Sequence, residues 1–379
     1  MAQVKLSFRF VVVLYVFTSA QICYTDDNPN PREKAEMKPD YYPNGLNVDD
    51  IKVTSKMNAS KHVPSSSTIT QLWHSKGKCP KGTIPIRRTK EEDVLRAKSV
   101  ERYGKKKRFS VAQQNLIDAE FELKEIDEYA SAYVDGREFY GTRATFNVWN
   151  PKVQESNELS LAQIWIVGCN SDDDNTLEDI NTIEAGWHVH PELYGNTATR
   201  LFIFWTSDGF QETGCYNLQC SGFVQTSNKI ALGSSLSPIS QLHGTQYQIT
   251  LLIWKDRKGT GDWWMRYGDT ELVGYWPSSM FSHLRESALL IEWGGEVVNT
   301  VSHGHHTTTQ MGSGQFPGKW FREASYVKNI ETVDESNTLR TTNLNIASDG
   351  NCYDVLTATD DTWGRYLFYG GPGRNANCP

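Results

Sequence analysis

The stretch FYGTRATFNVW at residues 139–149 carries the pattern that decides the fold. Apolar and polar residues alternate along it, which is typical of a β-strand with one buried face. Similar short segments follow, separated by Gly and Asp turn signals: LAQIWIVG (161–168), RLFIFWTSDG (200–209), YQITLLIW (247–254) and DWWMRYG (262–268). No helical periodicity is sustained outside residues 280–288, and no fixed-period repeat is visible. Residues 129–379 therefore predict an all-β domain, an antiparallel β-sandwich of two sheets.

Composition supports a folded, charge-segregated chain. Of 379 residues, 38% are hydrophobic and 12% aromatic, which allows a packed core and excludes a disordered or collagen-like protein. Residues 26–128 hold 20 Lys and Arg against 17 Asp and Glu, whereas residues 129–379 hold 16 against 28. An acidic body argues against nucleic-acid binding. It also predicts that charge helps to hold the mildly basic front segment against the body.

Residues 1–25 have the features of a secretory signal peptide. Lys5 and Arg9 precede the apolar run 10–17, which is too short to span a bilayer, and small residues follow at 18–20. The alternative is a buried N-terminal element. With no other long apolar run in the sequence, we expect an exported chain with no membrane partner after signal removal.

The segment 26–128 has the texture of a separate small domain. It is polar and irregular as far as about residue 70, with a glycosylation sequon at Asn58. Thr89, followed by three acidic residues, predicts the start of a helix. The basic run 105–108 predicts an exposed, protease-accessible junction, although a plain solvated linker is the commoner meaning of such a run.

Six cysteines remain if Cys23 leaves with the signal, and an exported chain favours disulfides. Cys215 and Cys220 are close enough in sequence to close a loop, and a bond between Cys352 and Cys378 would pin the C-terminus. Cys79 and Cys169 are left, one in each half of the chain.

Two carboxylates stand in unusual strand contexts. In the strand pattern IEAGWHVHP (183–191), one face carries Glu184, Gly186, His188 and His190, while Trp187 and Val189 point to the other. A glycine between the acid and the histidines leaves room for a ligand beside Glu184. In IEWGGEVV (291–298), two glycines weaken an apolar strand just before Glu296, as where another chain comes close. An acid in this aromatic setting should have a raised pKa. The alternatives are a solvent-facing polar strand and a bulge with an outward glutamate.

The run HGHHTTT (303–309) is a third polar cluster. Together with His188 and His190 it raises the question of zinc, but the spacing fits no zinc motif and favours a buried or pH-sensitive polar loop. Standard serine-hydrolase, zinc-protease and nucleotide-binding motifs are absent from the sequence. We expect no metal and no cofactor.

The chain resembles the plant neprosin family, whose name-giving member is a prolyl-cleaving glutamic endopeptidase. The resemblance runs nearly colinearly from residue 70 to the end and rests on a combination of motifs: CPKGTIPIRRT (79–89), FYGTRATFNVWNP (139–151), IEAGWHVHPELYG (183–195), TRLFIFWTSDGFQETGCYNLQCSGFVQ (199–225), GYWPSSMF (274–281), WGGEV (293–297) and HTTTQMGSGQFP (306–317). It implies a secreted zymogen with signal peptide 1–25, activation propeptide 26–128 and peptidase domain 129–379.

The family's catalytic glutamates correspond to Glu184 and Glu296. The resemblance implies cleavage after proline at acidic pH, without a metal and with the propeptide as inhibitor. The chemistry open to such a pair is attack of water on a peptide carbonyl, one glutamate as base and the other as acid, with the assignment open. We expect the flanking residues to bind substrate: Trp187, His188, Trp293, Gly294 and Gly295. Further aromatic candidates for a proline pocket, each with core packing as the alternative, are Trp205, Trp263, Trp264, Tyr267 and Trp276.

Two departures from the family pattern carry further hypotheses. His188 and His190 stand where relatives have uncharged residues, so protonated histidines would add positive charge beside Glu184. The cysteine pattern suggests a Cys79–Cys169 bridge between propeptide and body, with Cys23–Cys79 as the rival pairing. The alternative function is that of a carbohydrate-active or carbohydrate-binding sandwich protein of the cell wall.

Overall fold

The structure is a computed structural model that describes residues 21–25, 52–53, 70–80, 82–97, 99–106, 124–169, 179–301, 305–348 and 350–379. The apolar run of the predicted signal, Asn58 and the end of the basic run, residues 107–108, lie outside the described residues, so the predictions about them stay predictions. Among the described residues, no helix is long and apolar enough to cross a membrane.

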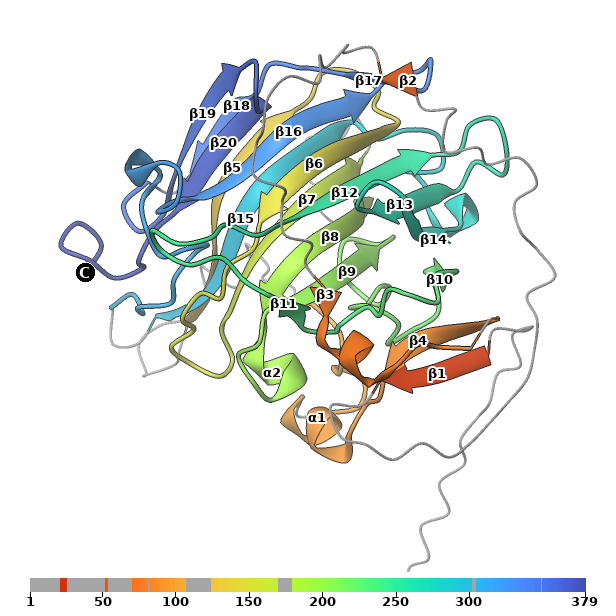
Figure 1. Ribbon diagram of the computed structural model, residues 1–379, viewed down its shortest axis with the longest axis horizontal. Helices are drawn as coiled ribbons and strands as arrows, with labels where there is room; N and C mark the ends of the chain where they lie inside the picture. Colours follow the sequence, from red (N-terminus) through yellow and green to blue (C-terminus); the bar gives the residue numbers. More distant parts are fainter. Residues whose placement is uncertain are drawn as a thin grey trace, which may run out of the picture.

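One layer of the fold is a six-stranded antiparallel sheet (Figure 1). Its strands, in spatial order, are β18 (Asn345–Ser348), β5 (Lys124–Val134), β15 (Leu290–Val301), β7 (Leu159–Gly168), β8 (Asn181–Val189) and β9 (Arg200–Thr206). Strand β7 thus lies between β8 and β15, the two strands on which the predicted glutamates were placed.

The second layer is a larger, mostly antiparallel sheet of ten strands. Its main path runs through β10 (Val224–Gln225), β14 (Glu271–Trp276), β13 (Trp263–Tyr267), β12 (Gln248–Lys255), β6 (Gly141–Asn147), β16 (Ser325–Val333), β17 (Thr338–Arg340) and β2 (Lys52–Val53). Strand β20 (Gly364–Gly370) pairs with β16 and with β19 (Asp354–Asp360). Short helices lie outside the sheets: α2 (Pro191–Tyr194) and the 3-10 turns Ser278–Met280 and Pro317–Lys319.

The hydrophobic core lies between the two sheets. It combines inward residues of the six-stranded sheet, such as Ile164 and Ile203, with inward residues of the larger sheet, such as Phe146 and Ile253, all fully buried. This is the arrangement that period-two alternation produces when two sheets bury one face each. The predicted antiparallel β-sandwich is confirmed.

The front segment forms a small unit against one end of the sandwich, where Figure 1 shows α1 beside α2 and β4 beside β1. Its elements are β1 (Gln21–Thr25), β3 (Thr70–Gln71), a 3-10 turn (Leu72–Lys76), β4 (Thr83–Arg87) and α1 (Glu91–Arg96). The predicted helix is therefore present, with three acidic residues in its first turn.

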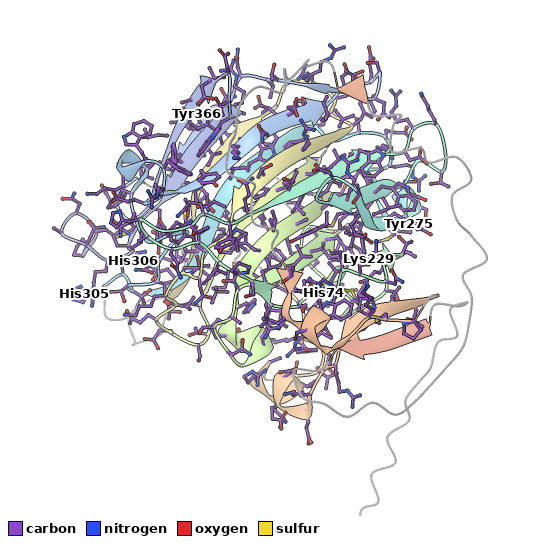
Figure 2. All side chains as sticks on the ribbon, in the orientation of Figure 1. His74, Lys229, Tyr275, His305, His306 and Tyr366 are labelled. Carbon is purple, nitrogen blue, oxygen red and sulfur yellow. A yellow bond between two sulfur atoms is a disulfide. The ribbon has the colours of Figure 1, made fainter. Side chains whose placement is uncertain are left out.

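Hydrogen bonds fasten this unit to the body. Strand β3 pairs with β11 (Leu236–Ser237), and the Gln71 side chain exchanges two 2.7 Å bonds with the backbone of Ala231. His74 lies beside Lys229, and the Nε2 atom of His74 is 2.7 Å from the carbonyl oxygen of Lys229 (Figure 2).

Strand β5 crosses the boundary predicted between residues 128 and 129. Its residues 124–128 pair with β15 inside the sandwich. Strand β1 likewise covers residues 21–25, which were assigned to the signal, and pairs in parallel with β4. Pairing between strands distant in sequence therefore involves residues on the far side of both predicted boundaries, and composition along the chain cannot reveal such pairing.

Between cysteines whose side chains are both described, the structure contains the disulfides Cys215–Cys220 and Cys352–Cys378. The Cys79–Cys169 bridge is wrong, because Cys169 is a free thiol while Cys79 is disulfide-bonded. Cys169 follows β7, which belongs to the sheet, whereas Cys79 belongs to the front unit. The rival pairing of Cys79 with Cys23 stays a prediction, since the Cys23 side chain is outside the described part of the structure.

Candidate active site

The two glutamates lie on the outer face of the six-stranded sheet, turned away from the core. Glu184 of β8 and Glu296 of β15 flank β7, and each side chain is at most 1% exposed. The outer face around them is apolar and aromatic. We call its buried residues the cleft cluster: Leu159, Leu161, Trp165, Leu193, Tyr194, Phe202, Phe204, Tyr216 and Val298.

A lysine from the front segment joins the two acids. Lys106 Nζ lies 3.3 Å from Glu184 Oε2 and 3.1 Å from Glu296 Oε2. The two carboxylate oxygens are therefore at most 6.4 Å apart, the sum of these distances. Residues 112 positions apart in the chain thus meet around a single atom, and that atom belongs to the segment predicted to be the propeptide.

The two carboxylates differ in their hydrogen bonds. Glu184 accepts bonds from Gln163 Nε2 at 2.9 Å and from Thr182 Oγ1 at 3.0 Å. Glu296 Oε1 is buried and has no hydrogen-bond partner among the described residues, and the same holds for Gln163 Oε1. Neutral donors favour the ionised form of the acid that they contact. An unpartnered buried oxygen marks a place for a proton, a water or a substrate atom.

Burial dominates the electrostatics of the pair. It raises the pKa of Glu296 to about 8; the Lys106 ammonium opposes this, while Asp127 and Glu184 add to it. Burial alone would lower the pKa of Lys106, but Glu184 and Glu296 outweigh it and raise that pKa well above its usual value. The lysine is therefore a charged ammonium, and Glu296 holds a proton more readily than an ordinary glutamate does.

A cavity of about 1000 Å³ adjoins the pair. Lys106 is one of its walls while also contacting both acids, so it separates the cavity from them. The other walls include the apolar side chains of Leu159, Leu193, Phe204, Phe210, Tyr216 and Val298. Charged and polar residues, among them Asp127 and His190, complete the lining, so the acids lie behind a lysine beside a cleft with one apolar side.

Three of the predicted substrate-binding residues face the wrong way. Trp187 and Trp293 are fully buried between the sheets, where their indole N–H groups donate to the Asn147 carbonyl and to Thr142 Oγ1 of β6. A Cβ atom at Gly295 would meet Met311 of the core at 2.6 Å. Because side chains alternate along a strand, immediate neighbours of the outward glutamates must point inward. For the wider aromatic set the alternative of packing holds. Trp205, Trp263 and Trp276 are buried in the core between the sheets and Tyr267 packs against it, while Trp264 is buried in a separate apolar cluster with Trp254.

The glycines serve the sheet. Gly186 and Gly294 lie opposite Gln163 on its two sides. A Cβ atom would meet the Ala162 carbonyl oxygen at 1.9 Å from Gly186, and the Ala130 carbonyl oxygen at 2.4 Å from Gly294. Both positions must be glycine because the neighbouring strands come so close. As a result, no side chain of an adjacent strand lies directly beside that of Gln163.

His188 lies on the outer face but is fully buried. Its ring stacks on Phe202 at 4.1 Å, and its Nε2 atom is 2.9 Å from the Tyr194 hydroxyl. Burial, together with the nearby His190 and Arg200, lowers its pKa well below the usual value. The expectation that His188 carries positive charge beside Glu184 is therefore wrong.

The third histidine cluster lies elsewhere, at the edge labelled by His305 and His306 in Figure 2. His306 is buried and bonds Glu128 of β5 and the Thr307 carbonyl. Its Nε2 or Nδ1 atom lies near the sulfur atoms of Cys352 and Cys378, but those sulfurs are bonded to each other. Disulfide sulfurs are not the thiolates that a zinc site needs.

Sequence reasoning missed the residues that contact the glutamates. Lys106 was assigned to an exposed junction, but its side chain is only 12% exposed and contacts both glutamates, which corrects that prediction. Gln163 stands in a plain apolar strand, where one polar residue flanked by Ala162 and Ile164 was the available signal. Tyr216, a loop residue that lines the cavity with Lys106, was missed as well, and its only signal was its place beside Cys215.

The chain is similar to one known family and to several solved structures. The Neprosin profile matches residues 156–372, more than half of the chain, and the Neprosin activation peptide profile matches residues 27–133. A solved structure of scytalido-glutamic peptidase with a peptide-based transition state analog aligns with 66% of this chain and 100% of its own, at 13% identity and a TM-score of 0.33. SCP-B, an Eqolisin-family peptidase in a complex with the tripeptide Ala-Ile-His, aligns with 65% of this chain and 98% of its own, at 12% identity and a TM-score of 0.31. A β-porphyranase from Bacteroides plebeius aligns with 44% of this chain and 55% of its own, at 9% identity and a TM-score of 0.23.

A buried pair of glutamates beside a cleft with one apolar side, covered by a front segment, defines a glutamic-type peptidase with an activation peptide. The chain belongs to the neprosin family.

Proposed function

We propose that this chain is the secreted zymogen of an acid-active endopeptidase in which Glu184 and Glu296 activate water to cleave peptide bonds after proline. One observation carries the proposal: both carboxylates lie within 3.3 Å of the same atom, Lys106 Nζ. A water molecule that replaces this nitrogen would be within hydrogen-bonding distance of both acids.

The hydrogen bonds favour one division of labour. Glu184, which accepts from two neutral donors, is the ionised base that takes a proton from water. Glu296, whose pKa burial raises, is the acid that donates to the carbonyl oxygen or to the leaving amine. The water oxygen bonds to the carbonyl carbon, the peptide C–N bond breaks, and the proton from Glu296 leaves on the amine. No covalent enzyme intermediate is needed.

The same contacts explain latency. With Lys106 in place, its ammonium occupies the water position, and the front segment forms a wall between the cavity and the acids. Because the sandwich strand β5 begins at Lys124, we place processing between residues 106 and 124. Since β1 begins at Gln21, we place signal cleavage after Ala20, within the small residues 18–20. Export to the extracellular space or an acidic vacuole, with glycosylation at Asn58, is part of this proposal.

Support for proline comes from the cleft walls. Phe204, Phe210 and Tyr216 line the cavity beside Lys106, and the Lys106 ammonium lies 5.7 Å from the centre of the Phe210 ring. A flat apolar ring such as that of proline suits aromatic walls of this kind. Family membership favours peptides over the carbohydrate ligands considered as the alternative.

The test is hydrolysis of a fluorogenic proline-containing peptide by the processed enzyme at about pH 3–5, where carboxylates titrate. We expect Glu184→Gln and Glu296→Gln to reduce kcat by at least about 10²-fold, the scale of a lost acid or base. Glu292→Gln is the matched control, because Glu292 is an outer-face acid of the same strand that bonds Ser131. A chelator should leave the rate unchanged. Full activity in the double variant Glu184→Gln/Glu296→Gln would refute the proposal.

A further inference from the structure

The front segment does more than insert a lysine, because its preceding residues run along the cleft. Tyr216 N–H donates to the Gly104 carbonyl oxygen at 2.7 Å. Lys105 Nζ donates to the Glu212 carbonyl oxygen at 2.6 Å. The loop between β9 and β10 therefore contacts Gly104 and Lys105, the two residues of the front segment that precede Lys106.

The side chain of Tyr103 packs into the apolar end of this cleft. It contacts the cleft cluster and lines the same cavity as Leu193 and Tyr216. Gly104, next in the chain, is buried so close to the body that a Cβ atom would meet Gln219 at 2.7 Å. The front segment therefore packs tightly against the body at residues 103–104, and the side chain that it places there is the aromatic ring of Tyr103.

We propose that the place of Tyr103 is a substrate subsite for an aromatic side chain, which a polypeptide substrate fills once the propeptide has left. The proposal rests on the function proposed above. Removal of the front segment exposes the apolar wall at Leu193 and leaves the Tyr216 N–H without its carbonyl partner. A substrate that supplies both an aromatic ring and the next carbonyl restores both interactions.

The chain direction of the front segment sets the expected position. It runs from Tyr103 at the subsite to Lys106 at the glutamates, so the aromatic residue should lie on the amino-terminal side of the scissile bond. The spacing on the segment is three residues. Because the Lys106 nitrogen reaches the acids through its own long side chain, positions two to five residues before the scissile bond need to be sampled.

The experiment compares peptides that carry one proline and a single Tyr or Ala at each of these positions, cleaved by the processed enzyme. We expect one position at which Tyr raises kcat/KM by about 10- to 100-fold over Ala, which corresponds to about 1.4–2.7 kcal/mol. Leu193→Ala should flatten this preference, while Leu356→Ala, a matched change at a half-exposed site on β19, should retain it. Thermal unfolding of both variants checks that they are folded.

The proposal is overturned if no upstream position favours Tyr, if Leu193→Ala leaves the preference intact, or if the preference falls after the scissile bond. Failure of the proposed function looks different. In that case the Tyr and Ala peptides are equally resistant to cleavage, and both proposals fall together.

Discussion

Lys106→Ala should produce an unprocessed chain that is already active. Lys106 is 12% exposed and makes two charge-assisted contacts, to Glu184 and Glu296, that hold the front segment over the acids. Removing one partner of a buried ion pair costs about 3–5 kcal/mol. We therefore expect the front segment to be held about 10²- to 10³-fold less tightly over the cleft, at about 1.4 kcal/mol per tenfold.

The pH dependence follows from the same contacts. Because burial raises the pKa of Glu296 to about 8, this group takes up a proton as the pH falls through that value, and its charge then no longer attracts Lys106. The contact between Lys106 and Glu296 joins two opposite charges only above that pH, so the front segment is held less tightly below it. The wild-type zymogen should thus be more latent above about pH 8 than in acid, whereas the alanine variant should be equally open at both.

The assay is peptide hydrolysis by the intact zymogen, with gel electrophoresis to show that the chain is still uncut. Lys105→Ala is the matched control, since this neighbouring lysine contacts only a backbone carbonyl in the part of the chain that the structure describes. If processing occurs after residue 106, each variant yields the same mature enzyme, so maximal activity calibrates every sample. An intact Lys106→Ala zymogen as silent as the wild type, with normal activity after processing, would show that the lysine does not maintain latency.

Three further changes test the surroundings of the pair. Gln163→Leu removes a donor to Glu184, so kcat should fall about tenfold while KM changes little; an unchanged kcat would contradict a positioning role. Trp187→Phe removes a buried indole hydrogen bond between the sheets and should lower the free energy of unfolding by about 1–3 kcal/mol with KM unchanged. A large rise in KM would show instead that Trp187 binds substrate. His306→Gln should destabilise the fold most in mild acid. Burial lowers the pKa of His306, but the hydrogen bonds to Glu128 and to the Thr307 carbonyl outweigh it, so the pKa is raised overall. The protonated histidine therefore stabilises the fold fully below its unfolded pKa of about 6.5, and this stabilisation is lost as the pH rises through the higher pKa of the folded state. Thermal unfolding across this range measures that loss, and a loss that grows with pH would refute it.

The local pattern was sufficient for much of the fold. Alternation predicted the strands and the sandwich, and it also predicted that Glu184 and His188 share a face while Trp187 takes the other. The disulfide Cys215–Cys220 could also be predicted from the sequence, because two cysteines only five positions apart can close a short loop without any long-range folding. These features depend on neighbours in sequence, which a single chain displays directly.

The order of strands in space decided the rest. Alternation says that two faces differ, but which face meets the second sheet depends on residues more than a hundred positions away, so Trp293 was expected in the cleft and lies in the core. The same reason applies to Lys106, Gln163 and the strand β5: each acquires its role from a partner that only the folded chain brings near. The sequence by itself thus determined the strands, the family and the two acids. Tertiary structure alone determined what touches those acids, because contacts between distant segments leave no local periodic trace.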